Sequence, residues 1–189
     1  MASPQFPEDK IRSAEQVAKR ALTLFNVWVL TSGATRDEVI EWFDEEGLRS
    51  ELTPFEARFL GDADPPRQAI VNMSWNAERL IVLLWALNVI DALPAPDEQC
   101  DTSLFRDLPP YGEQSASEFA KSAQLRPHDD LREMAWKILD LHWEARDASL
   151  NNKAPRTPVN IEMIQERHHA INWITGYGDL PWDEVTTDT

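Results

Sequence analysis

The stretch ERHHAINW, residues 166–173, holds the polar side chains of this chain whose types and spacing could do chemistry. Glu166 and His169 form a Glu-x-x-His unit, and di-metal carboxylate bundles place one such unit on each of two helices. At about 100° per helical residue, Glu162 falls beside them on a face that we expect to be solvated. Glu162, Glu166 and His169 are therefore weak candidates for metal ligands. Because the chain has no second Glu-x-x-His unit, we assign neither a metal nor another cofactor.

Two other polar residues of the same stretch project toward its apolar side. Arg167 falls within the apolar arc, and His168 lies at its edge. A buried guanidinium without a partner is very costly, so Arg167 needs a carboxylate. Glu78, in the apolar stretch WNAERLIVLLWAL, is the expected partner, and Asp147 is a second candidate. We predict a structural polar network around a buried ion pair, with His142 hydrogen-bonded nearby, made of Glu78, Arg167, His168 and Asn172.

The same cluster can also be interpreted as an active site. A desolvated carboxylate flanked by two histidines and an arginine has the groups needed for general acid–base catalysis. The chain has no G-x-S-x-G, G-x-G-x-x-G or P-loop motif and no Cys/His zinc pattern. We therefore favour the structural interpretation and assign no catalytic residue. The catalytic candidates that stay open are Glu78, His142, Arg167 and His168.

The elements that must position these residues are all predicted to be helices. Capping boxes start helices at Thr35, Thr53 and Ser115, and apolar residues between such signals recur at helical spacing. The chain is expected to be an all-α, single-domain irregular bundle over 1–189, with a body at 8–176 and a docked tail at 177–189 pinned by Trp182. The five main helices are expected near 11–29, 39–43, 65–90, 127–150 and 158–175, with further short helices and a Pro-rich loop over 91–114.

The charge and composition of the chain favour some classes of binding partner over others. Acidic residues outnumber basic ones 33 to 18, giving a net charge of −15, which repels nucleic acid and anionic lipid and attracts a basic protein. No secretory signal or membrane span is expected, so we predict a cytoplasmic protein. Trp136 and Trp143, one heptad apart, either cover a second layer of core or form an exposed strip that binds a partner. The single cysteine, Cys100, lies among carboxylates that raise its pKa and blunt its reactivity.

Four stretches resemble, in order along the chain, a bacterial family catalogued as domain of unknown function 4272. These stretches are LTPFEARFL, WNAERLIVLLWAL, LHWEARDA and ERHHAINWITGYGDLPWDEVTTDT. Two positions depart from the family's pattern: Asn76, where arginine is usual, and Asn88, where glycine is usual. The resemblance implies a helical bacterial domain and no particular reaction. The residues that match the family motifs are Glu78, Arg167, His168, Asn172, Trp173, Trp182, Asp183 and Asp188.

Three classes of function stay open. The favoured one is a non-enzymatic protein-binding module with an acidic surface, including an immunity- or inhibitor-like role against a basic effector. The alternatives are an unrecognised enzyme and a small-molecule-binding domain that use the Glu/His/Arg cluster. A fully packed cluster favours a structural role, whereas a cleft that reaches polar groups favours the alternatives.

Overall fold

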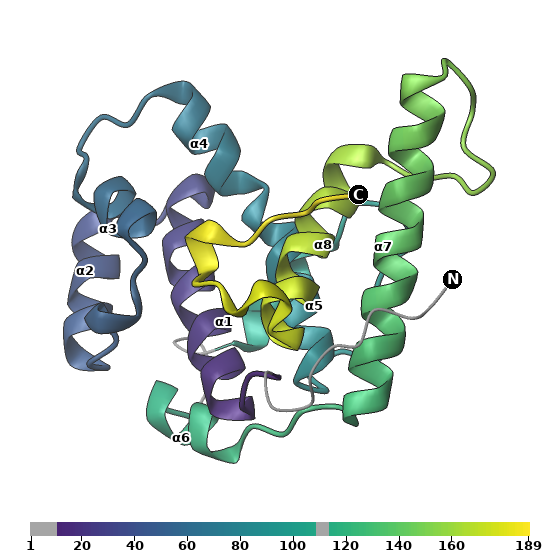
Figure 1. The fold of residues 1–189 in the computed structure, drawn as a ribbon. Coiled ribbons are helices and arrows are strands. Elements are labelled where there is room, and N and C mark those ends of the chain that lie inside the picture. Colours follow the sequence, from purple (N-terminus) through teal and green to yellow (C-terminus); the bar gives the residue numbers. More distant parts are fainter. Residues whose placement is uncertain (1–10, 109–113) are drawn as a thin grey trace.

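A computed structural model describes residues 11–108 and 114–189, without the side chains of residues 106 and 107. Within these residues every regular element is a helix and none is a strand, which confirms the predicted all-α single domain. The predicted start of the body at residue 8 and part of the Pro-rich loop lie outside the described residues. The α-helices, labelled in Figure 1, are α1 (Ala14–Trp28), α2 (Arg36–Glu45), α3 (Pro54–Gly61), α4 (Arg67–Ser74), α5 (Asn76–Ala86), α6 (Ala116–Ser122), α7 (His128–Leu150) and α8 (Ile161–Thr175). The short 3-10 helices are η2 (Val29–Ser32), η3 (Arg49–Glu51), η4 (Thr102–Asp107), η5 (Tyr177–Asp179) and η6 (Trp182–Glu184).

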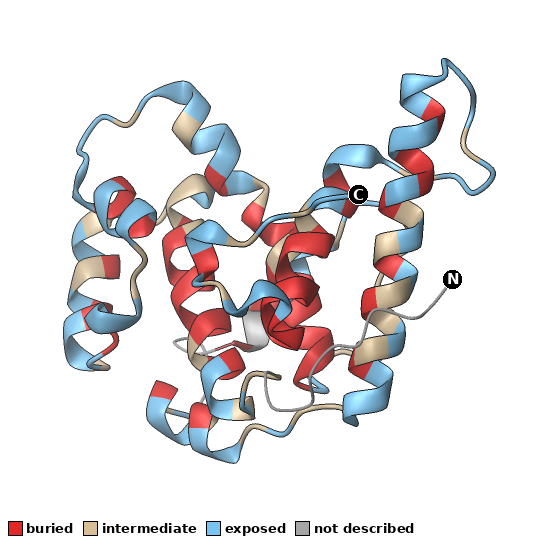
Figure 2. Cartoon of the chain, viewed as in Figure 1, coloured by how far each residue is buried: buried red, intermediate tan, exposed pale blue. Residues whose placement is uncertain are grey.

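α5 is the central helix, as its nearly continuous apolar sequence predicts. Of its eleven residues, all but Arg79 are buried. α1 and α8 pack against α5, α7 packs against α8, and α6 packs against α1. Buried positions therefore concentrate in α1, α5 and α8, as Figure 2 shows. Glu78 of α5 thus lies in the most enclosed part of the bundle, and Arg79 lies at its edge.

The single helix predicted over 65–90 is wrong, because the chain forms two helices that are separated at Trp75. The Ser74 hydroxyl donates to the Val71 carbonyl at 2.7 Å, and the Glu78 N–H bonds to the Trp75 carbonyl three residues back. Both contacts tighten the chain into a turn. Apolar spacing continues across this break, so periodicity alone does not reveal it.

Other helix ends agree better with the local sequence. The capping boxes at Thr35, Thr53 and Ser115 are confirmed. α8 begins after Asn160, whose side chain accepts two backbone N–H groups, rather than at residue 158. After α5, Asn88 adopts a φ of 60°. This is the left-handed region that favours glycine.

The C-terminal segment folds back along α8 and crosses toward α7 (Figure 1). Trp182 is 5% exposed, and its ring meets the rings of His169 and Trp173 edge-on, with centroids 4.7 and 5.2 Å away. The Arg20 guanidinium lies over the same ring at 5.0 Å, and Asn172 donates to the Thr186 carbonyl at 3.0 Å. The tail therefore covers the face of α8 that carries His169, Asn172 and Trp173.

Candidate functional site

The predicted Glu78–Arg167 ion pair is present, and the structure shows what it holds. The Arg167 Nε donates to a Glu78 carboxylate oxygen at 2.9 Å, and the two side chains are 4% or less exposed. The other Glu78 oxygen accepts the N–H of Cys100 at 2.8 Å. The remaining Arg167 amino groups donate to three carbonyl oxygens of the Pro-rich loop, at Pro94, Ala95 and Glu98. The pair therefore anchors that loop to α5 and α8, which the sequence did not reveal.

Cys100, beside this pair, has a thiol of low reactivity. Burial, together with the neighbouring Glu78 carboxylate, raises the pKa of the Cys100 thiol to about 12, so the thiol stays protonated. The carboxylates of its own loop, which the sequence suggested, are not the main cause. A pocket of about 440 Å³ reaches Glu78 and Cys100. Both Glu78 oxygens already accept hydrogen bonds, which leaves this pocket little reactive chemistry.

The two histidines of the predicted cluster form a separate pair. The Nδ1 atoms of His142 and His168 lie 2.9 Å apart, so one nitrogen donates and the other accepts. Burial lowers the pKa of both rings, and the pKa of His168 falls to about 4 with His142 beside it. Within the described residues no hydrogen bond links this pair to Glu78 or Arg167. The four catalytic candidates therefore form two pairs, with no hydrogen bond between the pairs among the described residues.

The expectation that Glu162, Glu166 and His169 share a solvated face is wrong for two of the three. Glu162 is exposed, but His169 is only 7% exposed because the tail covers it. Glu166 pairs with Arg79 of α5. Helical projection identifies the residues that share a face but not what covers that face. Among the described residues no group of three or more His, Cys, Asp or Glu side chains is placed to hold a metal ion.

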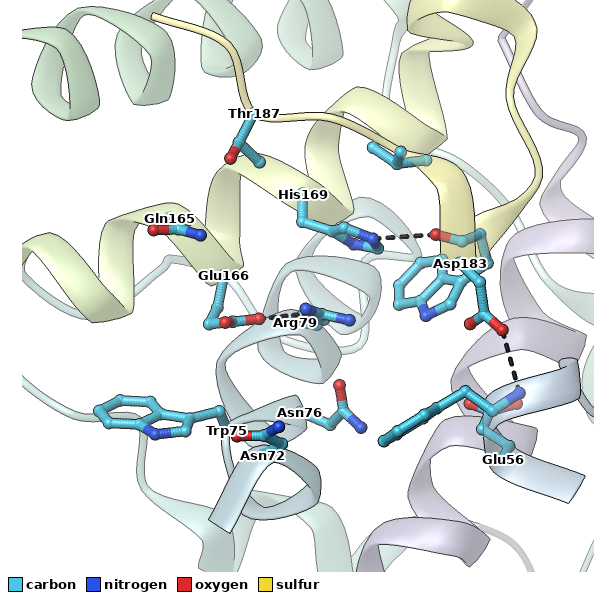
Figure 3. Close-up of a pocket in the computed structure, with 13 residues that line it drawn as sticks. Glu56, Asn72, Trp75, Asn76, Arg79, Gln165, Glu166, His169, Asp183 and Thr187 are labelled. Atoms are coloured by element: carbon cyan, nitrogen blue, oxygen red, sulfur yellow. Dashed lines mark hydrogen bonds and ion pairs between the residues drawn. The ribbon is translucent and has the colours of Figure 1, made fainter. Parts of the chain in front are cut away.

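This face borders a pocket of about 500 Å³, which we call the Arg79 pocket (Figure 3). Its volume falls in the range of natural ligand sites, roughly 300–1,000 Å³. The α4–α5 corner, α8, the start of α3 and the tail enclose it, and Phe55 and Trp75 add apolar surface. The polar residues that line it include Asn76, Arg79, Glu166, His169, Asp183 and Thr187.

The charged centre of the Arg79 pocket is only partly used by the protein. The Arg79 Nε donates to one Glu166 oxygen, and the side chains are 25% and 18% exposed. Among the described residues, the two terminal amino groups of Arg79 and the second Glu166 oxygen have no hydrogen-bond partner. A guanidinium offers five N–H donors. Most of the donors of Arg79 therefore remain available in the pocket.

His169 is a hydrogen-bond acceptor of fixed tautomer beside this centre. Its Nε2 lies 2.9 Å from the Trp182 carbonyl, which can only accept, so Nε2 carries the proton. Burial, and the Arg79 guanidinium next, lower the pKa of His169 to about 3. The ring is therefore neutral near pH 7, and its Nδ1 presents a lone pair. That Nδ1 is buried and has no partner among the described residues.

A second buried ion pair that the sequence analysis missed borders the pocket. Arg20 of α1 pairs with Glu56 of α3, and their side chains are 6% and 2% exposed. The Glu56 carboxylate also accepts the N–H of Thr53, the capping contact that the sequence does predict. The projection argument used for Arg167 would have found Arg20, which lies between Val17 and Leu24 on the apolar side of α1.

Trp136 and Trp143 of α7, expected either to cover a second layer of core or to form an exposed strip, differ in exposure. Trp143 is 51% exposed, whereas Trp136 is partly buried. One exposed indole on this helix is not a strip. Their role in binding a partner stays a prediction.

A family model described as domain of unknown function (DUF4272) matches residues 2–185 of the 189-residue chain. The chain belongs to the DUF4272 family. Searches of curated proteins and of solved structures found no match. In this DUF4272 protein no helix of the described residues is long and apolar enough to cross a bilayer.

The C-terminal motif of the DUF4272 resemblance includes residues that close the Arg79 pocket. The Trp182 carbonyl accepts from His169, and the Asp183 carboxylate accepts the backbone N–H of Phe55 at 3.1 Å. Figure 3 shows both contacts at the edge of the pocket. The C-terminal motif on which the resemblance rests therefore helps to close this site.

Proposed function

We propose that this DUF4272 protein binds a small polar ligand in the Arg79 pocket. The observation that carries the proposal is the partly exposed Arg79–Glu166 ion pair, whose remaining donors and acceptor face no partner among the described residues. Arg79 is also the residue of α5 that is not buried. The buried Arg167 is saturated by protein groups, whereas Arg79 keeps its terminal donors at the pocket.

Binding is a better interpretation of this pocket than acid–base catalysis. A general base works best when its pKa lies near the operating pH, and the pKa of His169 is about 3. The sequence has no nucleophile in a known catalytic context. The polar lining instead offers both donors and acceptors at fixed positions, which is what recognition of a polar molecule requires.

The test uses a substitution that fills the mouth of the pocket without removing a charge. Gln165 lines the pocket and is exposed, so Gln165→Trp should block entry while the fold is kept. Gln124→Trp, at an exposed site between α6 and α7, is the matched control. Native mass spectrometry and thermal-shift screening against a library of polar metabolites should find a ligand for the wild type and for the Gln124 variant. If Gln165→Trp binds every such compound equally well, the Arg79 pocket is not the site.

A basic protein of the cytoplasm is a second candidate partner, including an immunity- or inhibitor-like role. The net charge of −15 supports it, as does the 51% exposed Trp143 on α7, since exposed indoles often anchor interfaces. Affinity purification at low and high salt tests it. A stoichiometric basic partner that is lost at high salt and with Trp143→Ala would support this role. A chain recovered alone at low salt would argue against it.

A further inference from the structure

We propose that the ligand of the Arg79 pocket is a small zwitterion with an ammonium and a carboxylate close together, the chemistry of a free amino acid. This inference rests on the proposed ligand-binding function and adds the class of ligand. It follows from three neighbouring groups of the pocket: a guanidinium, a carboxylate and a neutral imidazole.

The carboxylate of the ligand would bind Arg79. The terminal amino groups of this guanidinium have no partner among the described residues, and they form the planar fork that binds carboxylates through paired hydrogen bonds. Glu166 occupies the Nε and leaves that fork open. Arg79 is held in place by this contact and by its position on the central helix. The donor that a carboxylate requires is therefore positioned in advance.

The ammonium of the ligand would bind Glu166 and His169. An ammonium has three donors and no acceptor, so it needs oxygen or nitrogen lone pairs around it. The second Glu166 oxygen and the His169 Nδ1 each have a lone pair without a partner among the described residues. The contact from Nε2 to the Trp182 carbonyl keeps Nδ1 unprotonated. His169 is therefore a fixed acceptor in the wall of the pocket, and an ammonium that reaches its buried Nδ1 would satisfy it.

Other classes of ligand match these groups less well. A simple carboxylate would satisfy Arg79 but would lie beside Glu166 and give no donor to His169. A simple amine would satisfy the acceptors but would lie beside the Arg79 guanidinium. A polyol can form the hydrogen bonds but leaves the adjacent opposite charges without a charged counterpart. The net charge of −15 also disfavours a ligand that carries only negative charge.

The experiment is titration calorimetry of the full chain with the common free amino acids, and with two analogues of each one that binds. The N-acetyl analogue lacks the ammonium, and the methyl ester lacks the carboxylate. Each analogue should bind at least about tenfold more weakly, because each loses charge-assisted hydrogen bonds. Arg79→Met should weaken binding of the free amino acid by a similar factor. Arg49→Met, which removes an exposed arginine paired with Asp44, should leave the affinity unchanged.

Gln165→Trp provides a second test that leaves every charge in place and should abolish amino-acid binding. Equal affinity for an amino acid and its N-acetyl analogue or ester would overturn the zwitterion. So would an unchanged affinity of a folded Arg79→Met. If polyols or simple carboxylates bind in place of amino acids and Gln165→Trp blocks them, the zwitterion is overturned and the proposed function stands. If none of the amino acids and none of the polar-metabolite library binds, both fall.

Discussion

Two arginine–glutamate pairs link the same two helices, α5 and α8, but one anchors a loop and the other borders a pocket. α5 carries Glu78 and Arg79 in succession, and α8 carries Glu166 and Arg167 in succession. Each helix gives one charge of each sign, so that Glu78 pairs with Arg167 and Arg79 pairs with Glu166. The first pair is closed by carbonyl oxygens and an N–H of the Pro-rich loop. The second borders a pocket.

The difference lies in the chain segment that covers each pair, not in the pair itself. The Pro-rich loop brings backbone groups directly onto Arg167 and Glu78. The tail instead bonds to His169 through the Trp182 carbonyl and gives no hydrogen bond to Arg79. The same two residue types therefore anchor the chain where the Pro-rich loop covers them, and form a candidate ligand site where the tail covers them.

We call Glu78–Arg167 the closed pair and Arg79–Glu166 the open pair. The largest effect should come from breaking the closed pair. Glu78→Gln and Arg167→Met should each lower the free energy of unfolding by about 3–5 kcal/mol, because each leaves a buried charge without its partner. Chemical denaturation measures this directly. Arg49→Met removes an exposed arginine paired with Asp44 and serves as the control, with little change expected. A shift for Arg167→Met no larger than that of the control would mean that the pair does not hold the loop.

The second largest loss of stability should come from loosening the tail, which lies over the open pair. Trp182→Ala should cost about 3 kcal/mol, in the usual range for a buried tryptophan, since Trp182 is 5% exposed. Hydrogen exchange should rise in the tail and at His169. The amide of Cys100, which bonds to Glu78, should stay protected. Faster exchange at Cys100 as well would mean that the two covers are not independent. Trp143→Ala, at a 51% exposed indole, is the matched control and should change stability by no more than about 0.5 kcal/mol.

Acid should act on the histidines that these contacts bury. The pKa of His168 is lowered to about 4 and that of His169 to about 3, from an ordinary 6.5. Above pH 6.5 both histidines are neutral in the folded and in the unfolded state. Below it the unfolded chain binds the protons first, so stability falls as the pH drops toward the folded pKa. Each site contributes up to about 1.4 kcal/mol per pH unit.

Denaturation midpoints between pH 7 and pH 4.5 measure this slope. His169→Gln should make it shallower, while the amide can still donate to the Trp182 carbonyl. His128→Gln, at an exposed histidine of α7, is the matched control. An unaltered slope in His169→Gln would show that His169 is not buried as a neutral ring.

The sequence predicted the closed pair better than the open one, for a physical reason. Burial forces Arg167 to find a carboxylate, and helical projection shows that Arg167 is buried. Arg79 lies beside Glu78 on a helix that projection alone treats as core, and Glu166 shares a face with His169 that seemed solvated. Both judgements depend on a tail whose path is set by long-range contacts of Trp182. The break at Trp75 was missed for a local reason, since a single turn leaves no mark on apolar spacing.

The smallest effect on stability should come from breaking the open pair. This result would distinguish the two pairs most directly. Arg79→Met and Glu166→Gln should each cost no more than about 1 kcal/mol. Their side chains are 25% and 18% exposed, and solvent screens a partly exposed pair. The same variants should nevertheless lose ligand affinity. Chemical denaturation beside Arg167→Met measures the difference within one pair of helices. If Arg79→Met destabilises the chain as much as Arg167→Met, the two pairs are equally structural and the Arg79 pocket loses its main support as a binding site.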